Sequence, residues 1–179
     1  MQDSRQDWLS FFMDLAILWA TRSTCTRRKV GAIAVRDKRV LASGYNGAAS
    51  GHPHCTPETC IRTINNIPSG EKLDFCAAIH AEQNVILQAA KIGVSLEGCD
   101  LYCTTMPCHT CLKLLLNLGI KNIYFSSDYD PGIIRNTIKN ELAKHGDTLP
   151  CYVTKVRKSK SNILESRWEI DPEYDISRE

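Results

Sequence analysis

Two short fragments of the sequence carry side chains that can bind a metal ion and move a proton, His-Ala-Glu at residues 80–82 and Pro-Cys-His-Thr-Cys at residues 107–111. Cys108 and Cys111 are three positions apart, so in the first turn of a helix they share one face. That spacing suits tetrahedral zinc, which prefers sulfur and imidazole ligands, and a helix N-terminus favours thiolates. His80 can supply a third ligand from the start of its own helix. Three protein ligands leave one position for water, which is typical of catalytic zinc.

Glu82 is the candidate proton carrier. It follows His80 by two residues, and on a regular helix such a pair does not share a face. If the helix begins at His80, its N-terminus can lie under the metal, and both side chains can then reach the bound water. A carboxylate in that place can take a proton from water and return it to a substrate. A lone C-x-x-C fragment is more often a structural clip or a redox pair, but the two fragments in this order match the signature of zinc-dependent nucleobase deaminases.

Further segments resemble the deoxycytidylate (dCMP) deaminases, and the cysteine-rich segment at about 47–79 resembles the bacterial and phage branch of that family. The similarity spans roughly residues 5–130, and the segments that carry it are 22–28 (Arg-Ser-Thr-Cys-Thr-Arg-Arg), 30–32 (Val-Gly-Ala), 44–47 (Gly-Tyr-Asn-Gly) and 80–84 (His-Ala-Glu-Gln-Asn). One departure is that Ala77 and Ala78 stand where related bacterial sequences commonly have an arginine or another polar residue.

This resemblance implies an α/β fold of the cytidine-deaminase type, with three layers and a central five-stranded mixed sheet flanked by helices. It also implies hydrolysis of dCMP to dUMP and ammonia, which supplies dUMP for thymidylate synthesis. In the family mechanism, His80, Cys108 and Cys111 hold a catalytic zinc that activates water. Glu82 passes a proton to ring N3 and then to the departing amine. No organic cofactor is needed.

The resemblance also suggests residues that contact the substrate. Asn46 is expected to hydrogen-bond the sugar hydroxyl, although Asn46-Gly47 also fits a simple turn that requires positive φ. Arg27 and Lys29 are candidates for binding the 5′-phosphate, because arginine offers a bidentate fork to phosphate; the alternative is a basic surface turn. Tyr129 either lines the base or phosphate pocket or is a half-buried core tyrosine.

The chain holds nine cysteines, and several fall in a segment from 47 to 79 that shows no sustained hydrophobic period. A loop of that length without structure is improbable inside a compact domain, and this one has too few large apolar residues to form its own core. We predict that Cys25, Cys55, Cys60 and Cys76 hold a second, structural zinc, because metal binding contributes folding free energy directly. His52 or His54 can replace one of the cysteines. The alternative is that these thiols are free and buried.

Alternating helix and strand patterns predict a sheet covered by helices, in a single deaminase domain, residues 1–179, with a cysteine-rich insertion at about 47–79. We expect helices at 5–22, 80–92, 107–118 and 133–144, and strands at 30–35, 39–44, 101–105, 123–126 and 149–156.

Composition limits the other classes of function. The net charge of +2 is too small to argue for a nucleic-acid partner, and no apolar run approaches the length of a membrane span. Without a signal-peptide pattern, the protein is expected in the cytoplasm, where thiols stay reduced. Two alternatives remain: a nucleic-acid deaminase such as a tRNA adenosine deaminase, and a non-catalytic zinc-binding interaction module, which the intact Glu82 disfavours. The resemblance further implies a homo-oligomer, a hexamer, activated by dCTP and inhibited by dTTP, with residues 44–47 in the responsive region.

Overall fold

The computed structural model of the protein describes residues 5–128, 151–159 and 167–172. Its centre is a six-stranded mixed sheet with the strand order β2-β1-β5-β6-β7-β8. In that order the strands are Arg39–Tyr45, Gly31–Arg36, Asp100–Thr105, Asn122–Ser127, Tyr152–Lys158 and Trp168–Ile170. Strands β5, β6 and β7 are parallel, whereas β1, β2 and β8 join by antiparallel pairing. The loops that follow β5 and β6 therefore lie at the same edge of the sheet.

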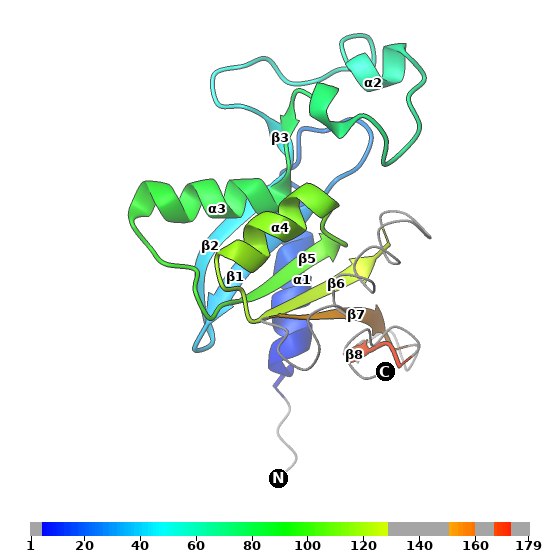
Figure 1. The fold of residues 1–179 in the computed structure, drawn as a ribbon. Coiled ribbons are helices and arrows are strands. Elements are labelled where there is room, and N and C mark those ends of the chain that lie inside the picture. Colours follow the sequence, from blue (N-terminus) through cyan, green and yellow to red (C-terminus); the bar gives the residue numbers. More distant parts are fainter. Residues whose placement is uncertain (1–4, 129–150, 160–166, 173–179) are drawn as a thin grey trace.

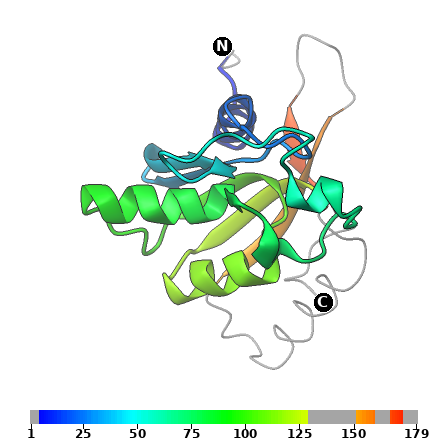
Figure 2. The same cartoon turned by 90° about the horizontal axis from the view of Figure 1, so that it is seen from above.

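Helices cover both faces of this sheet, which gives the three predicted layers (Figures 1 and 2). Helix α1 (Trp8–Ala20) packs on one face, while α3 (Ala81–Ile92) and α4 (His109–Asn117) lie on the other. Each interface has its own buried cluster, one around Phe12 and Met13, the other around Val85 and Leu115. Among the described residues, none of the helices has the length and apolar character needed to span a bilayer.

Two glycines allow the helices to approach the sheet at backbone distance. A Cβ atom at Gly31 would lie 2.2 Å from the carbonyl oxygen of Ala16 in α1, and one at Gly44 would lie 2.4 Å from that of Ala81 in α3. No side chain fits in such a gap, so both positions require glycine. The contact at Gly44 fixes the first residue of α3 against β2, and this sets the place of His80.

The insertion from 47 to 79 is held at its two ends. Its elements are β3 (Gly47–Ala48), α2 (Ile61–Ile64), a 3₁₀ turn (Leu73–Phe75) and β4 (Ala78–Ile79). Strands β3 and β4 pair antiparallel, which brings the start of the segment beside its end, directly before α3 (Figure 1). From residue 48 to residue 79 only Cys60 and Arg62 are buried. The insertion therefore has no hydrophobic core of its own.

The prediction of five strands is wrong, because β8 adds a sixth. This strand is three residues long, too short to show a period, and long-range contacts hold it in place. Its Trp168 donates one hydrogen bond from the backbone N–H to Oγ of Ser10 (2.8 Å) and one from Nε1 to Oδ1 of Asp14 (2.8 Å). The remaining predicted elements that fall in the described residues are present within a few residues of their expected bounds. The predicted helix at 133–144 lies outside the described residues.

Candidate active site

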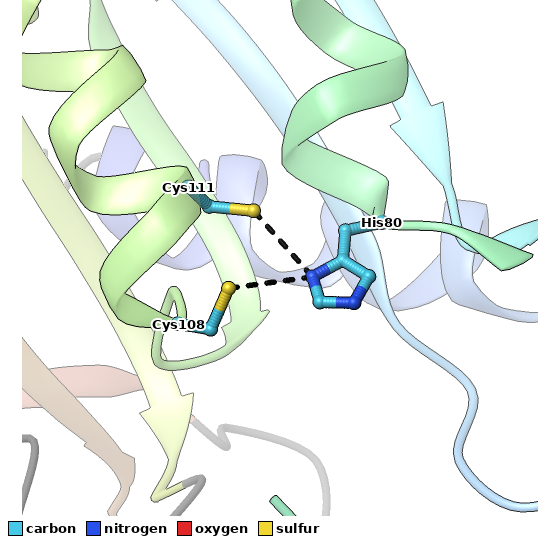
Figure 3. A group of neighbouring side chains, drawn as sticks. All are labelled: His80, Cys108 and Cys111. Atoms are coloured by element: carbon cyan, nitrogen blue, oxygen red, sulfur yellow. Dashed lines mark hydrogen bonds between the residues drawn. The ribbon is translucent and has the colours of Figure 1, made fainter. Parts of the chain in front are cut away.

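His80, Cys108 and Cys111 converge from two helix N-termini, as Figure 3 shows. His80 is the N-cap of α3, Cys108 is the N-cap of α4, and Cys111 lies in the first turn of α4. The imidazole Nδ1 of His80 is 3.5 Å from each of the two sulfur atoms. Of the residues that the structure describes, only these three form a metal-ligating group, with all ligand atoms within 4.8 Å of one another.

The spacing of these atoms fits zinc. Bond lengths of about 2.3 Å to sulfur and about 2.0–2.1 Å to nitrogen put a tetrahedral N and S about 3.6 Å apart. Both observed N···S distances are 3.5 Å, and both cysteines are buried. Two soft sulfurs and one imidazole form the donor set of a catalytic zinc centre with one open position.

Backbone geometry explains why the ligands converge. The prediction that α3 begins at His80 is right within one residue, and the Gln83 side chain accepts a hydrogen bond from the His80 N–H (2.9 Å). Asn84 also ties the first turn of α3 to β2, donating to the carbonyl oxygen of Tyr45 (2.7 Å). The prediction that both cysteines lie within the first helical turn needs a small correction, because Cys108 precedes it as the cap residue. At a cap, the unpaired N–H groups still favour a thiolate.

Hydrogen bonds and burial shift the pKa values of the two cysteines and the histidine. Hydrogen bonds from Cys111 and then from His80 lower the pKa of Cys108 to about 4, against the opposing effect of burial. The hydrogen bond to Cys108 and burial raise the pKa of Cys111. The hydrogen bond to Cys108 also raises the pKa of His80, and the charge of Arg62 opposes that rise. The cluster thus holds a thiolate near neutral pH, which is the form that binds metal.

Glu82 lies in the first turn of α3 and is only 4% exposed. Burial raises the pKa of its carboxyl group to about 7. A carboxyl group that titrates near neutral pH can accept and release a proton with similar ease, as a group that acts first as base and then as acid requires.

A cavity of about 230 Å³ opens beside the cluster, with His80, Glu82 and Cys108 in its wall. Three arginines line the same cavity, Arg27, Arg28 and Arg62, and Glu82 is the one acidic residue among the described lining residues. The cavity is therefore positively charged overall and suits an anionic ligand.

Asn46 lines this cavity, but not as a turn residue. Neither Asn46 nor Gly47 has a positive φ, so the alternative of a positive-φ turn is wrong. The Oδ1 atom of Asn46 accepts from the Val30 N–H (2.8 Å) and the Ser23 hydroxyl (2.6 Å), and its Nδ2 donates to the Arg28 carbonyl (2.8 Å). Gly47 is required by space, since a Cβ atom there would lie 2.4 Å from Oγ1 of Thr24. Asn46 thus fixes the loop that carries Arg27 and Arg28.

The candidate phosphate contacts differ in position. Arg27 lines the cavity, is exposed, and donates from Nη2 to the Ile67 carbonyl (2.8 Å). Lys29 is exposed and is not among the lining residues. Tyr129 lies outside the described residues. Sequence reasoning missed Arg62, because an arginine in an aperiodic segment gives no sign that it will be buried.

The four cysteines proposed as a second metal site are near neighbours without forming a ligand cluster. Burial raises the pKa of Cys55, and the Cys60, Cys76 and Cys25 thiols raise it further. No three of the four sulfur atoms, all within the described residues, meet the spacing that the His80 group meets. Cys25 and Cys76 also line the cavity.

The chain is similar to known proteins across most of its described length. Residues 6–127 match the model of the cytidine and deoxycytidylate deaminase zinc-binding region. The ComE operon protein 2 of Bacillus subtilis is 44% identical over 126 residues, which is 70% of this chain and 62% of that protein. A deoxycytidylate deaminase of Schizosaccharomyces pombe is 40% identical over 70% of this chain and 39% of its own length. The chain thus aligns with less than two thirds of either relative.

A solved structure gives the same match in three dimensions. The dCMP deaminase of the cyanophage S-TIM5, crystallised with dCMP and dUMP, superposes with a TM-score of 0.60 and 31% identity. The superposition covers 81% of this chain and 93% of the phage protein.

Proposed function

This chain belongs to the family of cytidine and deoxycytidylate deaminases, and we propose that it hydrolyses dCMP to dUMP and ammonia. The observation that carries the proposal is the buried Glu82, whose pKa is about 7, in one cavity wall with His80 and Cys108 of a His-Cys-Cys group spaced for zinc. A purely structural zinc site has no use for such an acid. The product dUMP would serve thymidylate synthesis.

The residues of the chain would act in a fixed order. His80, Cys108 and Cys111 would hold the zinc, which when bound makes water reactive at neutral pH. As the water oxygen attacks C4 of cytosine, the Glu82 carboxylate takes up a proton from that water and delivers it to N3. Glu82 then takes the second proton of the water and passes it to the amino group, so that the C4–N4 bond breaks and ammonia leaves. Water and dCMP are consumed, and dUMP and ammonia are formed.

The substrate contacts are proposals as well. The amide of Asn46 retains one N–H beyond its three hydrogen bonds, and we propose that this group meets the sugar hydroxyl. Arg27, at an exposed part of the cavity, would meet the phosphate group. Lys29 and Tyr129 remain candidates for the same end of the nucleotide.

A substrate panel tests this function directly. Pure zinc-loaded protein is incubated with dCMP, dCTP, cytidine, deoxycytidine and tRNA, and ammonia release is measured. We expect dCMP to have the highest kcat/KM. Deamination of tRNA alone would replace the proposal with a nucleic-acid deaminase, and failure to act on every substrate would favour a zinc-binding interaction module.

We also propose a second, structural zinc held by Cys25, Cys55, Cys60 and Cys76. Its support is the insertion itself, in which only Cys60 and Arg62 are buried from residue 48 to 79, so that apolar packing cannot order it. The effect of the Cys60, Cys76 and Cys25 thiols on the pKa of Cys55 supports a common location. A metal ion bound there would draw the four sulfurs together and contribute folding free energy to the insertion.

Assembly, control and location complete the proposal. We propose a single domain with the insertion at about 47–79, assembled as a homo-hexamer that dCTP activates and dTTP inhibits. The protein would be located in the cytoplasm, where thiols stay reduced, as both zinc sites require. Light scattering that gives a monomer, with deamination rates indifferent to dCTP and dTTP, would refute the assembly and its control.

A further inference from the structure

Arg62 is a buried arginine in a segment that has no hydrophobic core. Its side chain comes from α2, a helix of four residues in the insertion, and the residue is only 8% exposed. The guanidinium makes one hydrogen bond, from Nη2 to the carbonyl oxygen of Pro68 (2.8 Å). Within the described part of the chain, no carboxylate forms an ion pair with it. A buried positive charge with one neutral partner is costly unless a further partner arrives.

The position of Arg62 indicates what that partner is. Its Nε atom is buried and has no hydrogen-bond partner, and its side chain lines the cavity that also holds His80 and Glu82. Its charge opposes the rise in the pKa of His80, so the guanidinium is near the cluster. A ligand that places a reactive group beside Glu82 can therefore place an anionic group beside Arg62.

We propose that Arg62 is the specificity-determining residue of this site, binding the 5′-phosphate of a pyrimidine nucleoside monophosphate through its guanidinium group. This inference rests on the proposed deaminase function and names the part of the substrate that the site requires. The bond to Pro68 holds the guanidinium in place before the ligand binds, which leaves a fixed edge for the phosphate oxygens. A nucleoside without phosphate would leave the buried guanidinium with one neutral partner, and such a site rejects the ligand that lacks the partner group.

Arg62 and Arg27 are held by the same short loop. They donate to consecutive carbonyls, Pro68 and Ile67, so one short loop positions both guanidinium groups. Arg27 is exposed and is screened by water, whereas Arg62 is buried, and charge-assisted hydrogen bonds are stronger where water is excluded. The buried arginine should therefore provide most of the discrimination.

The test compares Arg62→Gln and Arg62→Lys with Arg36→Gln. Arg36 is a matched control, because its guanidinium also donates to backbone carbonyls, those of Ser95 and Glu97, but it lies away from the cavity. For Arg62→Gln we expect kcat/KM for dCMP to fall about 100-fold, with kcat/KM for deoxycytidine within about threefold of the parent. Arg62→Lys keeps the charge without the fork and should lose about tenfold. Arg36→Gln should match the parent on both substrates.

Two outcomes would overturn the role of Arg62: equal losses on dCMP and deoxycytidine, or a parent that does not prefer dCMP. Zinc content and thermal midpoint, measured on each variant, separate a lost contact from a lost fold. Calorimetric binding of dUMP and of deoxyuridine to the zinc-loaded protein needs no turnover. If the parent deaminates nothing yet binds dUMP more tightly than deoxyuridine, and Arg62→Gln abolishes that difference, the deaminase function fails while the phosphate site stands. No difference between dUMP and deoxyuridine in the parent refutes the site.

Discussion

The protein has two groups of cysteines, and they lie in different kinds of backbone. Cys108 and Cys111 lie at the start of α4, which packs on the sheet, and His80 reaches them from the start of α3. Cys25, Cys55, Cys60 and Cys76 lie in loops or at the edge of a single-turn helix. Only the first group has its ligand atoms at the spacing of a metal site.

The difference shows what preorganises a metal centre. In the His80 group, the start of α3 is held against β2 by the close approach at Gly44 and by the Asn84–Tyr45 hydrogen bond, so the fold itself places His80. In the insertion, the backbone has no core to hold it, so a metal bound by the four cysteines would have to supply the free energy that orders them. We therefore expect metal removal to leave the first group assembled and to loosen the second.

Glu82→Gln should produce the largest change and asks whether the preorganised group is chemically active. The substitution keeps the side-chain size and all three candidate ligands but removes the proton carrier. We expect kcat on dCMP to fall by about 10²–10⁴-fold with zinc content unchanged. Steady-state ammonia release and elemental analysis of the same preparation measure both quantities. Turnover within a few-fold of the parent would remove Glu82 from the mechanism.

Cys60→Ala and Cys111→Ala test the difference between the two cysteine groups. If the insertion holds a structural zinc, Cys60→Ala should reduce zinc from two atoms to one per chain and lower the free energy of unfolding by several kcal/mol. Cys111→Ala should also lose one zinc, and with it turnover, at a smaller cost in stability.

Cys99→Ala is the control for these variants, because it removes a fully buried thiol from the sheet core, away from both groups. It should keep both zinc atoms and cost about 1 kcal/mol. A parent with one zinc per chain, lost only when Cys108 or Cys111 is changed, would mean that the insertion is ordered without metal.

The smallest effect is a pH dependence of the zinc-free protein. Burial raises the pKa of Glu82 from 4.5 to about 7, so between these values the folded chain keeps a proton that the unfolded chain releases. Glu82 therefore lowers stability as pH rises through this window, and the full penalty is present above pH 7. Zinc-free Glu82→Gln should equal the zinc-free parent near pH 4.5 and exceed it by roughly 3 kcal/mol near pH 8. Urea unfolding across this range measures the difference, and a pH-independent difference would contradict the assigned burial effect.

Local patterns in the sequence predicted the features that depend only on neighbouring residues. The spacing of Cys108 and Cys111, and the end of α3 at Gly93 with its φ of 72°, are set within a few residues. Distant contacts decided the rest. Trp168 joins the sheet through Ser10 and Asp14, and Arg62 is buried by a loop fold that leaves no mark in hydrophobic period.

The insertion supplies part of the cavity wall, through residues such as Arg62, Leu73 and Cys76, while the sheet and its helices supply Glu82 and the ligands. We expect these two parts to open as separate cooperative units, since one has a large buried core and the other has almost none. Moderate heating or a single protease cut between residues 48 and 79 should therefore open the wall before the sheet unfolds. The protein would pass through a state that still holds its His-Cys-Cys group but has lost Arg62 from the cavity, and with it the proposed recognition of the phosphate.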